Sequence, residues 1–119
     1  MKILKQFITL MIGLFFVFIP QVLMTGVSKA ADIENGKKIY GKKCVFCHGQ
    51  GGKGDGPVAA SLPTNPGNFT DEEKMSQWSD ANLKEIILDG KTPMPSFKSK
   101  LSDTDIDDII AYIRTLAGK

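Results

Sequence analysis

Hydrophobic residues recur at helical spacing in three segments of this chain. The spacing predicts helices over about residues 33–43, 80–89 and 103–117, because apolar side chains three and four positions apart share one face of an α-helix. The last segment has the strongest pattern, and its expected buried face consists of Ile106, Ile109, Ile110 and Ile113. No segment alternates apolar and polar residues between hairpin turns, so no sheet is expected.

Polar residues at the ends of these segments support the same boundaries. Asp32 precedes the first helix as an N-cap, and Ser79 precedes the second, which ends before Gly90. Ser102 and Asp105 form a capping-box pattern at the start of the third helix. The sequence therefore predicts an all-α fold with three main helices.

A short fourth helical turn is expected at about residues 71–75. Thr70 and Glu73 have the spacing of a capping box, although no apolar run follows them. The expected fold is then three main helices with a possible short fourth.

The first thirty residues have the composition of an export signal. Two lysines provide a positive start, an apolar run covers residues 7–19, and Ala30 ends a small-residue cleavage site. We therefore expect a signal peptide over residues 1–30 and one domain over residues 31–119. An uncleaved anchor is the alternative, because the apolar stretch continues past Pro20 to nearly membrane-spanning length. Both interpretations place the domain in the periplasm.

The charge balance changes when the leader is set apart. The full chain has 15 basic and 13 acidic residues, and three of the lysines belong to the leader. The mature domain then has 12 basic and 13 acidic residues, a formal net charge of −1. Such a near-neutral domain gives no support for nucleic-acid binding. A lysine cluster near position 40 is either a steering surface for an acidic partner or ordinary helix surface; it comprises Lys37, Lys38, Lys42 and Lys43.

Cys44, Cys47 and His48 are the only two cysteines and the only histidine of the chain. Two thiols at this spacing, followed by an imidazole, are the attachment signal for c-type haem: the sulfurs bond the two vinyl groups and the histidine binds the iron. A thioredoxin-like thiol pair would accompany a βαβ pattern, which is missing here. A structural zinc site needs four ligands, one more than this chain has Cys and His. A lone disulfide remains the alternative.

A glycine-rich loop follows the motif, with glycine at positions 49, 51, 52, 54 and 56. It is not a phosphate-binding loop, because it lacks the terminal Gly-Lys-Ser/Thr and no strand precedes it. Backbone without Cβ atoms can pass close to a bulky group, so the loop is expected to approach the cofactor.

Methionine is the leading candidate for the second axial ligand, because no second histidine exists. Outside the leader the chain has Met75 and Met94. Met94 lies between Pro93 and Pro95, whose rings restrain the backbone around the thioether. Met75 lies in a polar, helical stretch and is interpreted as a gap-filling core residue. The predicted iron ligands are therefore His48 and Met94.

With the motif from Cys44 to His48, Pro57, Met94 and the two terminal helices, residues 32–117 resemble a class I monohaem cytochrome c of the small bacterial kind. The resemblance implies a cytochrome c fold wrapped around one haem c, bound covalently through Cys44 and Cys47.

The resemblance also implies contacts inside the domain. A glycine of the first helix lets an aromatic side chain of the last helix cross closely, and Gly36, with Tyr40 and Tyr112, matches this pattern. Pro57, nine residues after His48, is expected to present its carbonyl to the second ring nitrogen of the histidine.

A mature domain of 89 residues has a marginal hydrophobic core. The haem is therefore expected to contribute to folding, and the haem-free chain to be poorly ordered. Trp78, Lys91 and Thr92 are candidates for contact with the haem propionates, and the sequence does not choose among them.

The resemblance implies a periplasmic one-electron carrier, not an enzyme, that works as a monomer between redox protein partners. Two axial ligands leave no open iron position for a substrate. Two alternatives remain open: a haem subunit or relay domain of a larger oxidase or dehydrogenase, and a haem enzyme or gas sensor with a labile distal ligand.

Overall fold

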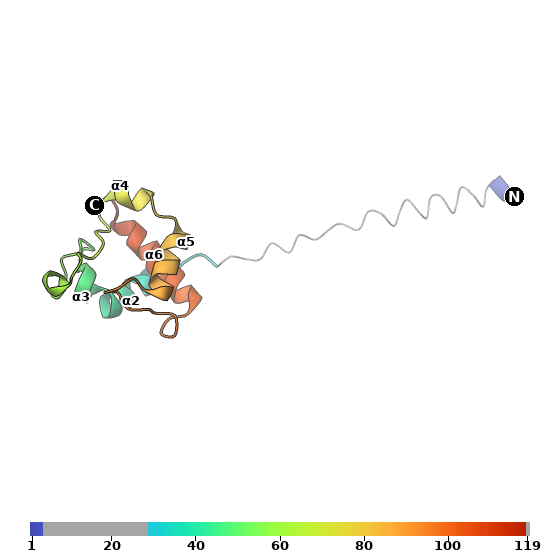
Figure 1. The fold of residues 1–119 in the computed structure, drawn as a ribbon. Coiled ribbons are helices and arrows are strands. Elements are labelled where there is room, and N and C mark those ends of the chain that lie inside the picture. The colour runs from blue at the N-terminus through green and yellow to red at the C-terminus, as the bar shows by residue number, and fades with distance from the viewer. Residues whose placement is uncertain (4–28, 119) are drawn as a thin grey trace.

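The computed structural model describes residues 1–3 and 29–118 (Figure 1). The apolar run of the expected leader, residues 7–19, lies outside this part of the chain. Within the described residues, no helix has both the length and the apolar character needed to cross a bilayer. The signal peptide and its cleavage after Ala30 stay predictions.

Helices form the regular structure of the domain (Figure 1). In chain order they are α2 (Ile33–Lys43), α3 (Val45–His48), the 3₁₀ helix η1 (Ala59–Ser61), α4 (Glu72–Ser76), α5 (Asp80–Asp89) and α6 (Asp103–Leu116). Helix α6 packs against both α2 and α5. Residues 1–3 and 29–118 contain no strand, and the all-α prediction is confirmed.

The helix ends follow the expected capping residues, with one correction. Ser79 and Ser102 each complete a capping box, and α6 ends one residue earlier than predicted. Thr70 does not cap α4. The side chain of Asp71 accepts a hydrogen bond from Lys74 N at 3.1 Å, while Thr70 donates to Asn68 Oδ1. An Asp at the position before the helix provides the stronger cap, which moves α4 one residue along the chain.

The apolar face of α6 is the centre of the core. Ile106 is 0% exposed, and Ile109, Ile110 and Ile113 are also buried, as their spacing predicts. Each such side chain contributes roughly 1.5–3 kcal/mol through apolar burial. The other elements add Tyr40, Met75, Leu83, Ile87 and Phe97 to this core.

Helices α2 and α6 cross at Gly36. A Cβ atom on Gly36 would lie 2.0 Å from the backbone oxygen of Asp108, so only glycine permits this approach. The nearest atoms of α6 at this position belong to the backbone of Asp108 and Ile109. Tyr40 and Tyr112 meet further along, with ring centroids 5.2 Å apart and planes at 62°. The close backbone approach at glycine brings these rings into edge-to-face contact.

A buried carboxylate joins the start of α2 to α6. Asp108 is 3% exposed, and its oxygens accept hydrogen bonds from Asp32 N at 2.7 Å and from Asn35 Nδ2 at 2.8 Å. These bonds satisfy the carboxylate where water cannot reach it. The first turn of α2 is therefore bound to α6 at the place where the described domain begins.

Candidate haem site

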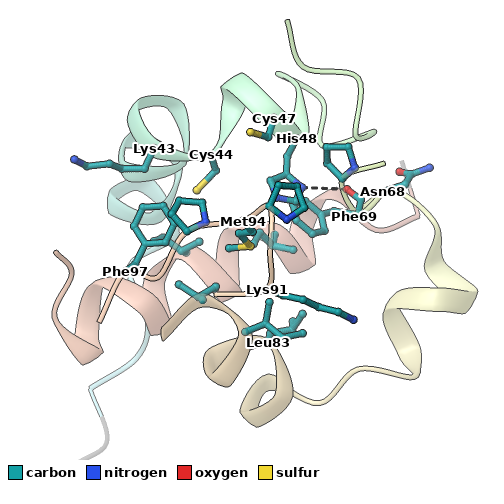
Figure 2. A pocket seen from close by; sticks show the side chains of 18 of the residues that line it. Lys43, Cys44, Cys47, His48, Asn68, Phe69, Leu83, Lys91, Met94 and Phe97 are labelled. Atoms are coloured by element: carbon teal, nitrogen blue, oxygen red, sulfur yellow. Dashed lines mark hydrogen bonds between the residues drawn. The ribbon is translucent and has the colours of Figure 1, made fainter. Parts of the chain in front are cut away.

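One cavity of about 490 Å³ lies between α3, α5, α6 and the loops that join them (Figure 2). Apolar side chains from α5 and α6 form much of its wall, including Leu83, Ile86, Ile87, Ile109 and Ile113. Four of the predicted site residues also line it: Cys44, Cys47, His48 and Met94. Pro57 is not among the lining residues.

The turn after α2 presents the two thiols. Cys44 N donates to Tyr40 O at 2.9 Å, and His48 N donates to Cys44 O at 2.9 Å, so one helical turn follows the other directly. Figure 2 shows the sulfurs of Cys44 and Cys47 on the same side of the cavity as His48. Both thiols are free, so the disulfide alternative is wrong for this structure.

The Cys44 thiol is held in its neutral form. Burial, and to a smaller extent the nearby Cys47, raise the pKa of Cys44 to about 11. An apolar environment disfavours a thiolate. Conversion into a thioether removes this ionisable group, which suits a sulfur on an apolar wall.

The imidazole of His48 is oriented by the loop over residues 67–69. Its Nδ1 lies 3.1 Å from the carbonyl oxygen of Gly67, and the ring stacks on Phe69 with centroids 4.5 Å apart and planes at 21°. A carbonyl can only accept, so Nδ1 carries the proton and Nε2 keeps a lone pair with which it could bind a metal. Burial lowers the pKa of His48, while the bond to Gly67 opposes this shift. Burial thus favours the neutral imidazole that ligates metals.

The expected role of Pro57 is wrong, because Gly67 supplies the carbonyl. The chain around Pro57 is bonded to the backbone of α3 instead: Gly56 N donates to Cys47 O at 3.1 Å and Val58 N donates to Phe46 O at 3.2 Å. These two bonds hold Pro57 in an exposed position outside the cavity.

The glycine-rich loop also differs from its expected role. Residues 49–56 do not line the cavity. Instead, Gly52 O accepts a hydrogen bond from Phe69 N at 2.6 Å, and a Cβ on Gly54, whose φ is +78°, would lie 2.5 Å from Pro66 O. The glycines therefore permit close packing against the loop that orients His48, and their effect on the site is indirect.

Met94 and Met75 both line the cavity, from different elements. Met94 lies in the loop between α5 and α6, where Met94 N donates to Lys91 O at 2.8 Å and Lys91 N donates to Met94 O at 3.1 Å. Figure 2 shows its thioether in the cavity. Met75 is 5% exposed within α4 and packs in the core, in agreement with its interpretation as a core residue. Met94 therefore keeps its place as the expected second ligand.

Polar groups at the cavity complete the lining. Trp78, Lys91 and Thr92 all line it.

The sequence did not reveal the role of the loop of residues 65–69, which includes Gly67 and Phe69. The length of this loop varies among such proteins, so its residues cannot be aligned by their distance from the motif. The turn residues Pro66 and Gly67 are the local signal that marks a bend there.

The residues present fit a c-type haem. A thiol pair, a neutral imidazole with a free Nε2, a thioether and apolar walls are the donor set and surroundings of this cofactor. Within residues 1–3 and 29–118, no three His, Cys, Asp or Glu side chains converge as a metal-binding group. The fold and this site define a small monohaem class I c-type cytochrome.

Comparison with known proteins gives the family. The chain belongs to the family described as cytochrome C oxidase, cbb3-type, subunit III, whose model matches residues 31–113. Cytochrome c6 of Synechocystis sp. is 33% identical over 90 residues, which cover 76% of this chain and 70% of that protein. The cbb3-type cytochrome c oxidase subunit FixP of Bradyrhizobium diazoefficiens is 33% identical over 91 residues, 76% of this chain but 29% of FixP.

Solved structures agree with this assignment. The KustC0563 c-type cytochrome has a TM-score of 0.61 and 28% identity, and the match covers 69% of this chain and 96% of that one. The Kuenenia stuttgartiensis reducing HAO-like protein complex Kustc0457/Kustc0458 has a TM-score of 0.63 and 34% identity over 71% of this chain and 43% of that one. The chain therefore shares its fold with a small cytochrome and with part of a larger assembly.

Proposed function

We propose that this protein is a periplasmic one-electron carrier with a single haem c, attached through Cys44 and Cys47 and ligated by His48 and Met94. The observation that carries the proposal is that two thiols, an imidazole and a thioether line one and the same cavity. Its membership of a haem electron-carrier family supports the same conclusion.

The haem, when bound, supplies an iron that changes between the ferric and ferrous states. The protein's own residues set the conditions for that change. Gly67 holds the Nδ1 proton of His48, which fixes the tautomer and the ring orientation. The thioether of Met94 and the apolar walls from α5 and α6 would both raise the reduction potential of a haem held there. With His48 and Met94 both holding the iron, no coordination position would be left for a substrate, which would favour electron transfer over substrate chemistry.

Partner proteins would dock where the cofactor comes nearest to the surface. Phe46, between the two cysteines, is 64% exposed. The ion pairs of the described residues involve Lys74, Lys84 and Arg114, so they leave the α2 lysines uncompensated. These lysines are Lys37, Lys38, Lys42 and Lys43. An exposed apolar side chain just after a helix that carries these lysines suits brief docking of an acidic redox partner.

A substitution of the proposed distal ligand tests this function. We expect the purified protein to show a c-type haem spectrum in both redox states, with a long-wavelength sulfur-to-iron band in the ferric form. Met94→Ala should remove that band, because no thioether would then bind the iron. Met75→Leu, which conserves side-chain volume, should retain it.

Other outcomes of this experiment would contradict the assignment. Persistence of the band in Met94→Ala, together with its loss in Met75→Leu, would make Met75 the ligand. A five-coordinate ferric spectrum of the unmodified protein would favour a gas sensor or haem enzyme.

A second candidate function is that of a haem subunit in a larger oxidase. The family description and the partial match to FixP favour it. Size-exclusion chromatography of a native extract separates the two functions, because a free carrier elutes as a small monomer and a subunit elutes with its complex.

A further inference from the structure

Arg114 connects the last turn of α6 to the segment that runs from the end of α4 to the first residue of α5. Its Nε and Nη2 donate to Asp80 Oδ1 at 3.0 and 2.8 Å. Its Nη1 donates to Met75 O at 2.6 Å, and Nη2 also donates to Trp78 O. One guanidinium therefore binds two backbone carbonyls and a carboxylate that are 34 to 39 positions away in the sequence.

The segment bound by Arg114 is a wall of the haem cavity. Met75 and Trp78 both line the cavity. The other hydrogen bonds of the described residues 72–82 are local: Gln77 N donates to Lys74 O, Trp78 N donates to Met75 O, and the Ser79 cap lies within the same stretch. Among these residues, every hydrogen bond to a distant element comes from Arg114.

The chemistry of arginine suits this task. Its planar fork presents several donors in fixed directions, and it keeps its charge at every physiological pH. Hydrogen bonds to a charged group contribute more than bonds between neutral groups. A lysine at position 114 has one ammonium and cannot reach Met75 O, Trp78 O and Asp80 in the same geometry.

We propose that Arg114 is a positioning residue that holds the wall segment of residues 75–80 closed over the haem. It acts through the carbonyls of Met75 and Trp78, and the closed wall keeps water from the cofactor and raises the reduction potential. This inference rests on the proposed function, because it assigns the cavity to haem.

The test compares Arg114→Gln with two matched controls in the haem-containing protein. Lys84→Gln removes another α5–α6 ion pair, in which Lys84 Nζ lies 3.0 Å from Asp107 and 3.9 Å from Asp103, but Lys84 does not line the cavity. Asp80→Asn removes the carboxylate charge and leaves both carbonyl contacts of Arg114 in place.

The readouts are the reduction potential and the amide hydrogen exchange of residues 75–80. We expect Arg114→Gln to lower the potential and to speed exchange in this segment about tenfold or more, as the loss of charge-assisted hydrogen bonds implies. Both controls should keep the potential and the exchange rates of the unmodified protein. Arg114→Lys should give an intermediate result.

Several results would overturn the inference. One is an unchanged potential in Arg114→Gln, and another is an equal shift in Lys84→Gln, which would indicate only a general loss of stability. If Arg114→Gln does not retain haem, the test uses Arg114→Lys instead. A reduction potential of Arg114→Lys equal to that of the unmodified protein would then contradict the proposal. Failure of the proposed function would give a different result from failure of the inference about Arg114: the unmodified protein would itself lack a c-type haem spectrum.

Discussion

Two glycines on α2 have opposite surroundings. At Gly36, an added Cβ would lie 2.0 Å from Asp108 O and 2.5 Å from the carbonyl carbon of the same residue. At Gly41, an added Cβ would meet no atom within 4 Å. The same residue type is therefore required at one position and costs helix stability at the other, since glycine is less favourable than alanine inside a helix.

This contrast predicts opposite effects of two alanine substitutions. Gly36→Ala should destabilise the haem protein by about 3 kcal/mol, because the α2–α6 contact must separate to admit the methyl group. Gly41→Ala should stabilise it by about 0.5–1 kcal/mol. Guanidinium unfolding measures both changes, and equal effects of the two variants would contradict the crossing geometry described for Gly36.

The helices begin where side chains satisfy their first amides. At α6, Ser102 Oγ accepts from Asp105 N at 3.1 Å, and Ser102 N donates to Asp105 Oδ2 at 3.1 Å. The Ser102 hydroxyl also donates to the same carboxylate at 2.7 Å, and these bonds lower the pKa of Asp105. The start of α6 therefore depends on a charge that acid removes.

Ser102→Ala should reduce the free energy of unfolding by about 1 kcal/mol at neutral pH, the usual cost of losing an N-cap. Asp105 binds a proton less readily in the folded state than in the unfolded chain. The contribution of Asp105 to the free energy of unfolding is therefore complete above its pKa in the unfolded chain, about 4. It is lost as the pH falls through the lowered pKa of the folded state. Consequently, the difference between Ser102→Ala and the unmodified protein should shrink in acid.

Unfolding curves at pH 7 and at pH 3 measure this dependence. Thr104→Ala is the control, because Thr104 is exposed in the same turn of α6. If the loss of unfolding free energy in Ser102→Ala were larger at pH 3 than at pH 7, the assignment of Asp105 to the cap would be refuted.

At the scale of the whole molecule, the domain is built around its cavity. The core residues of α5 and α6 continue into the cavity wall through Leu83, Ile87, Ile109 and Ile113. A cavity of about 490 Å³ inside so small a domain leaves much of this apolar surface without protein contacts. Haem would cover it, so cofactor binding and folding are expected to be coupled.

Removal of both attachment thiols tests this coupling. The double substitution Cys44→Ser and Cys47→Ser should give a haem-free chain without a cooperative unfolding transition and with weak near-ultraviolet circular dichroism. The haem-containing protein under the same conditions is the control. A sharp, native-like transition of the haem-free chain would show that the core is sufficient by itself.

Much of the site could be predicted from single residues and short spacings. Cys44, Cys47 and His48 lie within one turn of each other, and their chemistry names the cofactor before any fold is known. That Met94 lines the cavity agrees with its prediction as second ligand, which was made because few competitors exist and two prolines flank it. The Pro57 prediction was wrong because the acceptor of the His48 bond is Gly67, 19 residues from the histidine. Its position depends on how two loops pack.

The sequence by itself determined the three main helices, their N-caps, the haem-attachment motif and the buried stripe of α6. Each of these depends on residues within a few positions of one another, where local geometry is nearly independent of the rest of the chain. Only the tertiary structure decided what orients His48, what crosses Gly36 and what Arg114 binds. These contacts join residues that are distant in sequence, and they form when packing of the helices and loops brings their backbones together.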